Sequence, residues 1–291
     1  MDVRKLMMCG LVAGFSLALV SKTALADGPK GTAVIKGKVV LADGAKVKTK
    51  RIKMGGTPAC AGMHSKPVPD QGTLVYKKQG NAVPYTFVYL KKGVTAKYDP
   101  PETPIVLDQQ GCMYHPHVFG MIAGQGIDIK NSDNLNHNIH SLAKKNPTFN
   151  FLQANPMTKQ LRGKATFTRK EVMVKIKCDV HSWMSSYCGV LTHPFFDVSK
   201  SHEDTKVKDE RGTFEIKDLP AGTYVVEAIH EKLGRVTQKV TVKDGETKEI
   251  EIAIGGKGAA PMAFRTVELP VADAAVRTDE AEGAADSVEK E

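Results

Sequence analysis

The sequence lacks the signals of several common protein classes. After residue 26 it has no apolar run long enough to cross a membrane. It has no block of lysine and arginine interleaved with aromatic residues, which argues against nucleic-acid binding. No Ser-His-Asp set and no paired carboxylates stand out, so we find no machinery for hydrolysis and expect no enzyme. Aromatic residues make up only 6% of the chain, whereas its 26 glycines and 15 prolines suit short strands and many turns.

Acidic residues are outnumbered in the body of the chain. The formal net charge is +9, yet the segment from Glu268 onward is acidic, so the residues before it are more basic than the total indicates. A basic body attracts acidic protein surfaces, and we expect a transient acidic redox partner. Residues 257–291 are rich in Ala, Glu and Asp without a period, which predicts a disordered acidic tail.

The first 26 residues have the pattern of a secretory signal peptide. A short basic start is followed by the apolar run "LMMCGLVAGFSLALV" and by "ALA" before Asp27. We therefore expect cleavage after Ala26 and a periplasmic or otherwise exported mature protein. In such a compartment disulfide bonds are permitted.

The remaining chain is predicted to be all-β. Short alternating runs are separated by turns, and no stretch shows a sustained 3.6-residue period. In "KEVMVKIKCDV" the alternation places Val172, Val174, Ile176 and Cys178 on one face. Residues 27–103 form an N-terminal β region in this interpretation.

A separate β pattern covers residues 199–256. Four strand-like runs are divided by Pro-Ala-Gly, Leu-Gly and Asp-Gly turns, and the "LPAGTY" turn spans Leu219 to Tyr224. This segment resembles a carboxypeptidase-regulatory-like module, which implies an immunoglobulin-like or transthyretin-like β-sandwich. Because "GKVVLADG" near the start resembles the first strand of such a module, one split sandwich with an inserted centre is an alternative that the sequence leaves open.

The stretch "KCDVHSWMSSY" concentrates soft metal ligands. Cys178, His181 and Met184 offer a thiolate, an imidazole and a thioether within seven residues. A type 1 copper site needs these three and one further imidazole. "DNLNHNIHS" supplies His137 and His140 as candidates. Since His137 shares the inward face with Ile139, it is the better choice, and Asn138 is expected to tie its loop to the cysteine loop by hydrogen bonding.

The spacing of these residues resembles the cupredoxins. His-Asn-x-His about forty residues before C-x2-H-x2-M is similar to the family's ligand pattern, and the short loop is similar to that of amicyanin. The resemblance covers residues 104–198, and it implies a Greek-key β-sandwich with one type 1 copper on His137, Cys178, His181 and Met184. Ser182 stands where the family often has proline. The C-terminal ligand histidine of the family lies closest to solvent, so we expect an electron-exchange edge at Trp183 beside it. The alternative is that Trp183 fills the core beneath the copper, because tryptophan is highly buried on average.

Other readings remain beside this one. Zinc also accepts thiolate and imidazole, although a thioether argues against it. A Cys and a Met near a strand end are often simply core residues, which would make the chain a metal-free surface protein. Copper storage or delivery is the functional alternative to electron transfer.

The remaining cysteines and histidines carry weaker signals. Cys60 and Cys112 both lie in Gly- or Pro-containing turns, and we expect a disulfide between them. Cys188 is expected to be a buried small residue. His115 and His117 are weak candidates for a second metal site.

Overall fold

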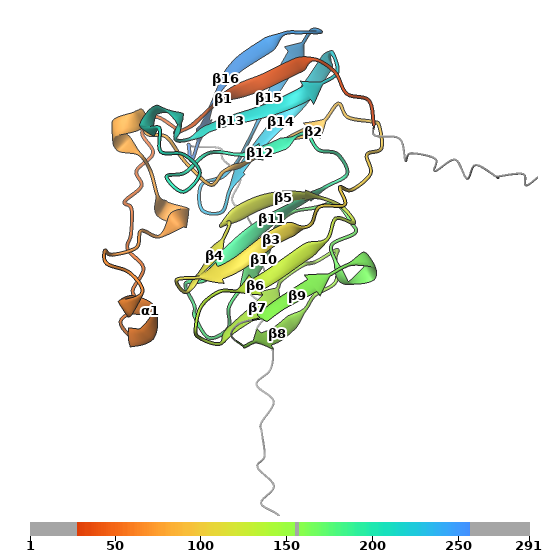
Figure 1. Cartoon of the computed structure of the whole chain (residues 1–291). Helices are drawn as coiled ribbons and strands as arrows, with labels where there is room; N and C mark the ends of the chain where they lie inside the picture. Colours follow the sequence, from red (N-terminus) through yellow and green to blue (C-terminus); the bar gives the residue numbers. More distant parts are fainter. Residues whose placement is uncertain (1–27, 155–156, 257–291) are drawn as a thin grey trace, which may run out of the picture.

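The computed structural model describes residues 28–154 and 157–256 (Figure 1). The predicted signal peptide, residues 1–26, and the predicted acidic tail, residues 257–291, lie outside these described residues. Within them the chain is nearly all β, which confirms the predicted fold class. No helix in the described part has the length and apolarity that a membrane crossing requires. The short helices are α1 (Pro58–Gly62), η1 (Gln71–Thr73), η2 (Lys77–Gln79), η3 (Gly163–Ala165) and η4 (Lys208–Glu210).

Strands from both ends of the described chain form one sandwich, which we call the split sandwich (upper half of Figure 1). One sheet has the order β13–β1–β16, and the other has the order β12–β2–β14–β15. The strands are β1 (Ala33–Leu41), β2 (Phe87–Lys92), β12 (Phe196–Val198), β13 (Thr213–Leu219), β14 (Gly222–His230), β15 (Gly234–Val242) and β16 (Thr247–Ile254).

Strand β1 joins the two ends of the described chain in one sheet. It is antiparallel to β13 and parallel to β16, so the N-terminal strand lies between two C-terminal strands. Inward-facing residues of both sheets, among them Ile35 and Phe214 of one sheet and Val226 of the other, form a continuous apolar core. Of the two arrangements that the sequence leaves open, the strand pairing is that of one split sandwich. β12 also belongs to it through β2, although β12 precedes the domain boundary placed at residue 198.

The strands between β2 and β12 form a second sandwich, which we call the central sandwich (lower half of Figure 1). Its sheets have the orders β5–β11–β10–β7–β8 and β4–β3–β6–β9. The strands are β3 (Ile105–Gln110), β4 (Met113–His115), β5 (Val118–Ile122), β6 (Ile127–Asn131), β7 (His137–Ser141), β8 (Asn150–Gln153), β9 (Met157–Leu161), β10 (Glu171–Lys177) and β11 (Ser185–Leu191).

Strand β10 departs from the simple alternation predicted for it. The register against β11 shifts between Glu171 and Val174, and Met173 has a positive φ of 60°. An irregularity of this kind re-aims the side chains before it. Val172 therefore packs near the junction between the sandwiches and not in the central core, which corrects its predicted placement with Val174. Beyond the irregularity, Val174, Ile176 and Cys178 alternate inward as predicted.

The sandwiches pack against each other through an aromatic junction. Phe87 of β2, Tyr187 and Leu191 of β11 and Ile229 of β14 belong to one buried cluster. A Cβ atom at position 189 would lie 2.2 Å from the Phe87 ring, so Gly189 is the residue that allows β11 to approach.

Residues 42–86 connect β1 to β2 and run along one side of both sandwiches, and we call them the crossing segment (orange in Figure 1). Two stretches of this segment pair with each other in an antiparallel arrangement. The Ile52 N–H donates to the Val68 carbonyl at 2.9 Å, and the Asp70 N–H donates to the Lys50 carbonyl at 2.9 Å. A disulfide joins Cys60 of α1 to Cys112 between β3 and β4, the pair that the sequence analysis expected to be bridged. The crossing segment is thereby tied to the central sandwich.

Candidate metal centre

The loop between β10 and β11 folds back on itself. The Cys178 N–H donates to the Met184 carbonyl at 3.1 Å, and the Met184 N–H donates to the His181 carbonyl at 2.9 Å. Cys178 continues the inward face of β10, and Met184 directly precedes β11. This ligand loop, residues 178–184, therefore holds three soft side chains at one end of the central sandwich.

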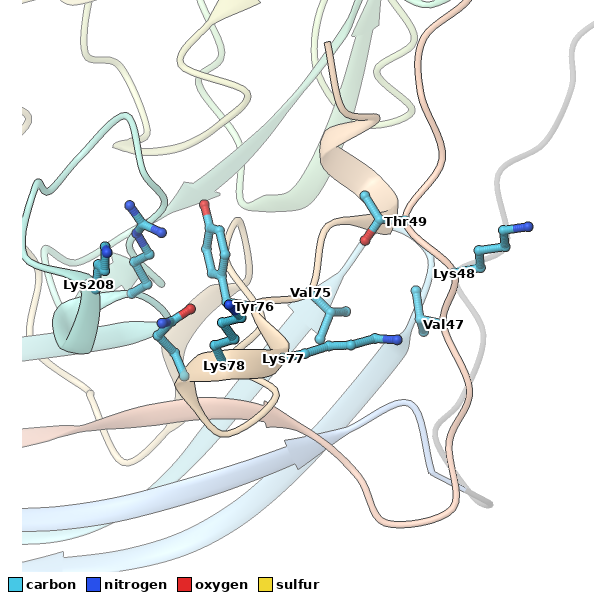
Figure 2. Close-up of a pocket in the computed structure, with 10 residues that line it drawn as sticks. Val47, Lys48, Thr49, Val75, Tyr76, Lys77, Lys78 and Lys208 are labelled. Atoms are coloured by element: carbon cyan, nitrogen blue, oxygen red, sulfur yellow. The ribbon is translucent and has the colours of Figure 1, made fainter. Parts of the chain in front are cut away.

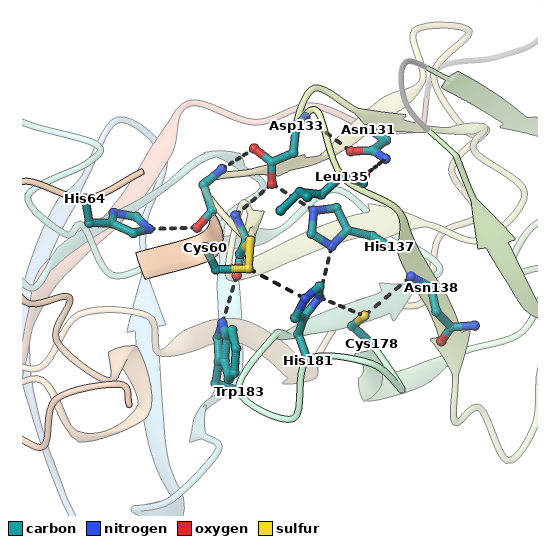
Figure 3. Close-up of a disulfide and its surroundings, with 12 residues drawn as sticks. Cys60, His64, Asn131, Asp133, Leu135, His137, Asn138, Cys178, His181 and Trp183 are labelled. Atoms are coloured by element: carbon teal, nitrogen blue, oxygen red, sulfur yellow. Dashed lines mark hydrogen bonds and ion pairs between the residues drawn. A yellow bond between two sulfur atoms is a disulfide. The ribbon is translucent and has the colours of Figure 1, made fainter. Parts of the chain in front are cut away.

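Donor atoms from this loop and from β7 converge at one buried point (Figure 3). His137 Nδ1 lies 3.1 Å from His181 Nδ1, and Cys178 Sγ lies 3.6 Å from the same nitrogen. The three ligand atoms all lie within 4.8 Å of one another. His137 is 0% exposed, Cys178 2% and His181 6%, and Met184 is fully buried in the adjoining core. The structure thus brings His137, Cys178 and His181 together away from water and buries Met184 in the core beside them.

These distances suit a shared metal ion. At ordinary bond lengths, two imidazole nitrogens on one metal lie about 3.3–3.6 Å apart, and a nitrogen and a thiolate sulfur lie about 3.5–3.8 Å apart. The observed separations of 3.1 Å and 3.6 Å come within a few tenths of an ångström of these values. Loading an ion therefore requires only small movements of the side chains.

Asp133 sets the orientation of the His137 ring. Its Oδ2 lies 2.8 Å from His137 Nε2, and its two carboxylate oxygens accept the N–H groups of Gly111 at 2.6 Å and Cys112 at 2.7 Å. With Nε2 directed at Asp133, Nδ1 faces Cys178 and His181, where it would give up its proton when a metal binds. The sequence analysis missed Asp133. Its only signal was a carboxylate four residues before a candidate ligand, in the turn that leads to β7.

Asn138 links the two ligand-bearing segments. Its backbone N–H donates to Cys178 Sγ at 3.4 Å, and its side-chain oxygen accepts the N–H of Asp179 at 3.0 Å. Tyr114 also donates its hydroxyl to the Asn138 carbonyl at 2.5 Å. The start of β7 is therefore held against the cysteine loop in the way that a metal site needs.

The outer edge of His181 is covered by the disulfide. His181 Nε2 lies 3.6 Å from Cys60 Sγ (Figure 3). Trp183 is half-buried, its ring lies 5.3 Å from that of His181, and its Nε1–H donates to the Cys112 carbonyl at 3.0 Å. The resemblance implied that His181 lies closest to solvent, but the crossing segment places α1 over it and leaves it 6% exposed.

Hydrogen bonds at the site favour the thiolate form of Cys178. Burial by itself would raise the pKa of Cys178, but hydrogen bonds from His137 and from the backbone of Asn138 hold that pKa below its usual value. Burial would lower the pKa of His137, yet its hydrogen bonds to Cys178 and Asp133 raise it. Burial and the neighbouring His137 lower the pKa of His181, so its ring stays neutral. A thiolate and a neutral imidazole are the forms that bind metals.

The other histidines singled out in the sequence lie elsewhere. His140 points away from the cluster, and its Nδ1 lies 3.1 Å from Asp179 Oδ2. His115 Nδ1 lies 3.6 Å from Glu203, whereas His117 contacts the buried Glu231 at 2.6 Å. The structure does not bring His115 and His117 to a common point. Cys188 is fully buried within β11, as expected for a small core residue.

The chain has structural likenesses but no sequence relatives among curated proteins. No protein-family model matches it, and no curated protein matches it. A copper-containing nitrite reductase from Thermus scotoductus SA-01 is similar over 34% of this chain and 25% of its own, with 20% identity and a TM-score of 0.27. This chain therefore spans about a quarter of that enzyme's length.

Two small cupredoxins are similar to the same degree. A purple cupredoxin from Nitrosopumilus maritimus covers 30% of this chain and 99% of its own, with 18% identity and a TM-score of 0.25. A reduced-state amicyanin mutant covers 36% of this chain and 98% of its own, with 16% identity and a TM-score of 0.27. Because these TM-scores are low, the function of this chain has to be inferred from its own residues.

Proposed function

We propose that this chain is an exported type 1 copper protein that transfers electrons. The observation that carries the proposal is the buried convergence of His137 Nδ1, His181 Nδ1 and Cys178 Sγ within 4.8 Å of one another. In the proposal these residues and Met184 hold one copper ion. When bound, copper supplies a one-electron couple between Cu(I) and Cu(II).

The donor set favours copper over harder metals. Thiolate and thioether ligands select soft ions, and two imidazoles with one thiolate and a weak thioether are typical of blue-copper sites. Asp133 fixes the ring of His137, and the hydrogen bond from Asn138 restrains the Cys178 sulfur. The chain therefore holds its ligands in one arrangement before the metal binds, which suits an ion that must change charge with little movement.

Burial favours electron transfer over copper storage or delivery. An exchangeable site needs exposed ligands, whereas here the disulfide covers His181 and no ligand is more than 6% exposed. Four side chains fill the ligand positions in the proposal and leave none for a substrate, so we propose no enzymatic role. Export is supported by the signal-like residues 1–26 and by the disulfide, since disulfides persist in oxidising compartments.

Metal analysis joined to visible spectroscopy tests the proposal. Protein loaded with Cu(II) should bind one equivalent and show an intense thiolate-to-copper absorption, which disappears on reduction and returns on reoxidation. Zinc loading provides the matched control and should give no visible band, because zinc has no redox change and a filled d shell. Stoichiometric copper without that band would overturn the type 1 assignment.

A further inference from the structure

A polar cavity opens beside the ligand loop. Its volume is about 370 Å³, and it lies between the crossing segment, β10 and the loop that carries the candidate ligands. Its lining includes Lys50, Arg51, Lys53, Ser182 and Trp183. Two of these, Ser182 and Trp183, come from inside the ligand loop itself. The cavity therefore borders the loop that carries the candidate ligands.

The carboxylates of this cavity are already engaged. Asp70 forms an ion pair with Lys232 at 2.8 Å. Glu231 contacts His117 at 2.6 Å and accepts the Tyr187 hydroxyl at 2.8 Å. Neither carboxylate is left to neutralise the lysines and the arginine of the crossing segment that line the wall.

The crossing segment supplies an excess of positive charge. Within residues 28–154 and 157–256, Lys50, Arg51 and Lys53 form no ion pair. An arginine fork and two nearby ammonium groups bind carboxylate oxygens through charge-assisted hydrogen bonds. The wall is thus suited to an acidic ligand.

The covered histidine makes this cavity the approach to the centre. His181 is 6% exposed and its Nε2 faces the disulfide, so a partner cannot rest on that edge. Trp183 reaches the cavity on one side, and its ring lies 5.3 Å from the His181 ring on the other. Of the two residues, only Trp183 offers a partner a surface.

We infer that this cavity is the recognition site for the carboxylates of an acidic electron-transfer protein, which docks on Lys50, Arg51 and Lys53 and contacts Trp183. This inference rests on the proposed electron-transfer function. In the docked pair, copper held by His137, Cys178, His181 and Met184 would accept one electron from the partner, and no bond would form or break. The contact is small and short-lived, as redox encounters are.

A second basic pocket supplies a matched control. Lys48, Lys77, Lys78 and Lys208 line it, and Arg211 lies over the Tyr76 ring at 5.0 Å (Figure 2). It shares no lining residue with the cavity beside Trp183 and contains no residue of the ligand loop. Charge reversal at Lys77 and Lys78 therefore changes the net charge equally without touching the proposed site.

Trp183 is the only tryptophan in the chain, so its fluorescence reports on the cavity in metal-free protein. Titration with a hexaglutamate peptide should change that fluorescence saturably, and the affinity should fall as salt rises. The double variant Lys50→Glu/Lys53→Glu should bind at least about tenfold more weakly. The control Lys77→Glu/Lys78→Glu should retain an affinity within about twofold of the wild type, since its charges lie outside the cavity.

Three outcomes would overturn the inference. Equal weakening in both double variants would mean that only the net charge matters. Inorganic phosphate that binds as tightly as the peptide would mean a small-anion site and not a partner site. A peptide that leaves the fluorescence unchanged would remove the site altogether. The titration uses no copper, so its result does not depend on metal binding. Failure of the protein to bind copper would contradict the proposed function, whereas it would leave the peptide-binding result unchanged.

Discussion

The two sandwiches of this protein differ in what they bury. The core of the split sandwich contains no cysteine among its described members, and the buried His193 beside it bonds the Leu90 carbonyl at 3.0 Å. The core of the central sandwich includes Cys60, Cys112, Cys178 and Cys188, and two buried histidines adjoin it. Both cores are closed to water, yet only the central sandwich brings a thiol and two imidazoles within 4.8 Å of one another, and such groups are costly to bury without partners.

The split sandwich therefore serves as a framework, whereas the central sandwich holds the candidate metal ligands. An apolar core stabilises a fold by removing surface from water and needs no particular partner. A cluster of imidazole, thiolate and carboxylate groups at the end of the other core is stable only because each group has a partner, such as Asp133 for His137. The split sandwich still contributes to the site from outside, since its Glu231 and Lys232 reach the cavity beside Trp183.

The largest expected effect separates the two buried free thiols of the central sandwich. Cys178→Ser should abolish the visible copper band, because a hydroxyl cannot supply the soft thiolate on which the transition depends. Cys188→Ser should retain the band, since Cys188 lies in β11 outside the convergent group. Absorption spectra of both copper-loaded variants check this, and equal loss in the two would contradict the site.

A substitution in the core of the split sandwich should lower stability and leave the copper band unchanged. Ile216→Ala should lower the free energy of unfolding by about 2–5 kcal/mol, because it leaves a cavity in a packed core. Ile216 is 2% exposed in the split sandwich. The copper band of the folded variant should be unchanged, and a changed band would show that the two sandwiches are not separable in this way.

Removal of the disulfide should both destabilise the protein and open the site. For a bridge that closes 52 residues, the chain-entropy estimate is about 4 kcal/mol. Cys60→Ala/Cys112→Ala should also release copper faster to a chelator, because Cys60 then no longer covers His181. Denaturant unfolding and chelator kinetics measure the two effects. An unchanged release rate in the folded variant would contradict the covering role.

Acid should weaken the junction between the sandwiches through Glu231. Burial would raise its pKa, but the hydrogen bond and charge of His117 lower that pKa to about 2 from a usual 4.5. A carboxylate with a depressed pKa stabilises the folded state above pH 4.5, and this contribution is lost as pH falls toward 2. The contribution is about 3 kcal/mol from the size of the shift.

Glu231→Gln tests this contribution. Its unfolding free energy should depend less on pH between 4.5 and 2 than that of the wild type. Glu203→Gln serves as control, because the Glu203 side chain is 35% exposed and solvent screens its contact with His115. A pH dependence that is identical in wild type and Glu231→Gln would show that this ion pair does not hold the junction.

The smallest expected effect concerns the two histidines of β7. His140→Ala removes a partly exposed contact with Asp179, which retains Lys177 at 2.6 Å, so the loss of stability should stay below about 1 kcal/mol. Its copper band should be nearly intact, whereas His137→Ala should weaken or remove the band. Parallel spectra check the pair, and equal loss would contradict the choice of His137.

Local pattern determined the strand content of the chain and the inward direction of several side chains. Strand periodicity has a fixed value of two, so alternation alone placed Ile176 and Cys178 inward and put His137 opposite His140. The C-x2-H-x2-M spacing brought three soft side chains into one loop, because residues this close in sequence need no distant contact to meet. The same reasoning failed at Val172, where the irregularity at Met173 leaves no mark in the alternation of apolar residues.

Tertiary structure alone decided which distant segments meet. Asp133 orients His137 only because the β3–β4 turn supplies the two N–H groups that hold its carboxylate. The covered His181 follows from a crossing segment whose path depends on β1 pairing between β13 and β16, far along the chain. The contacts that hold Asp133 and cover His181 join residues from 21 to 121 positions apart and depend on packing of whole sheets, which no local period encodes.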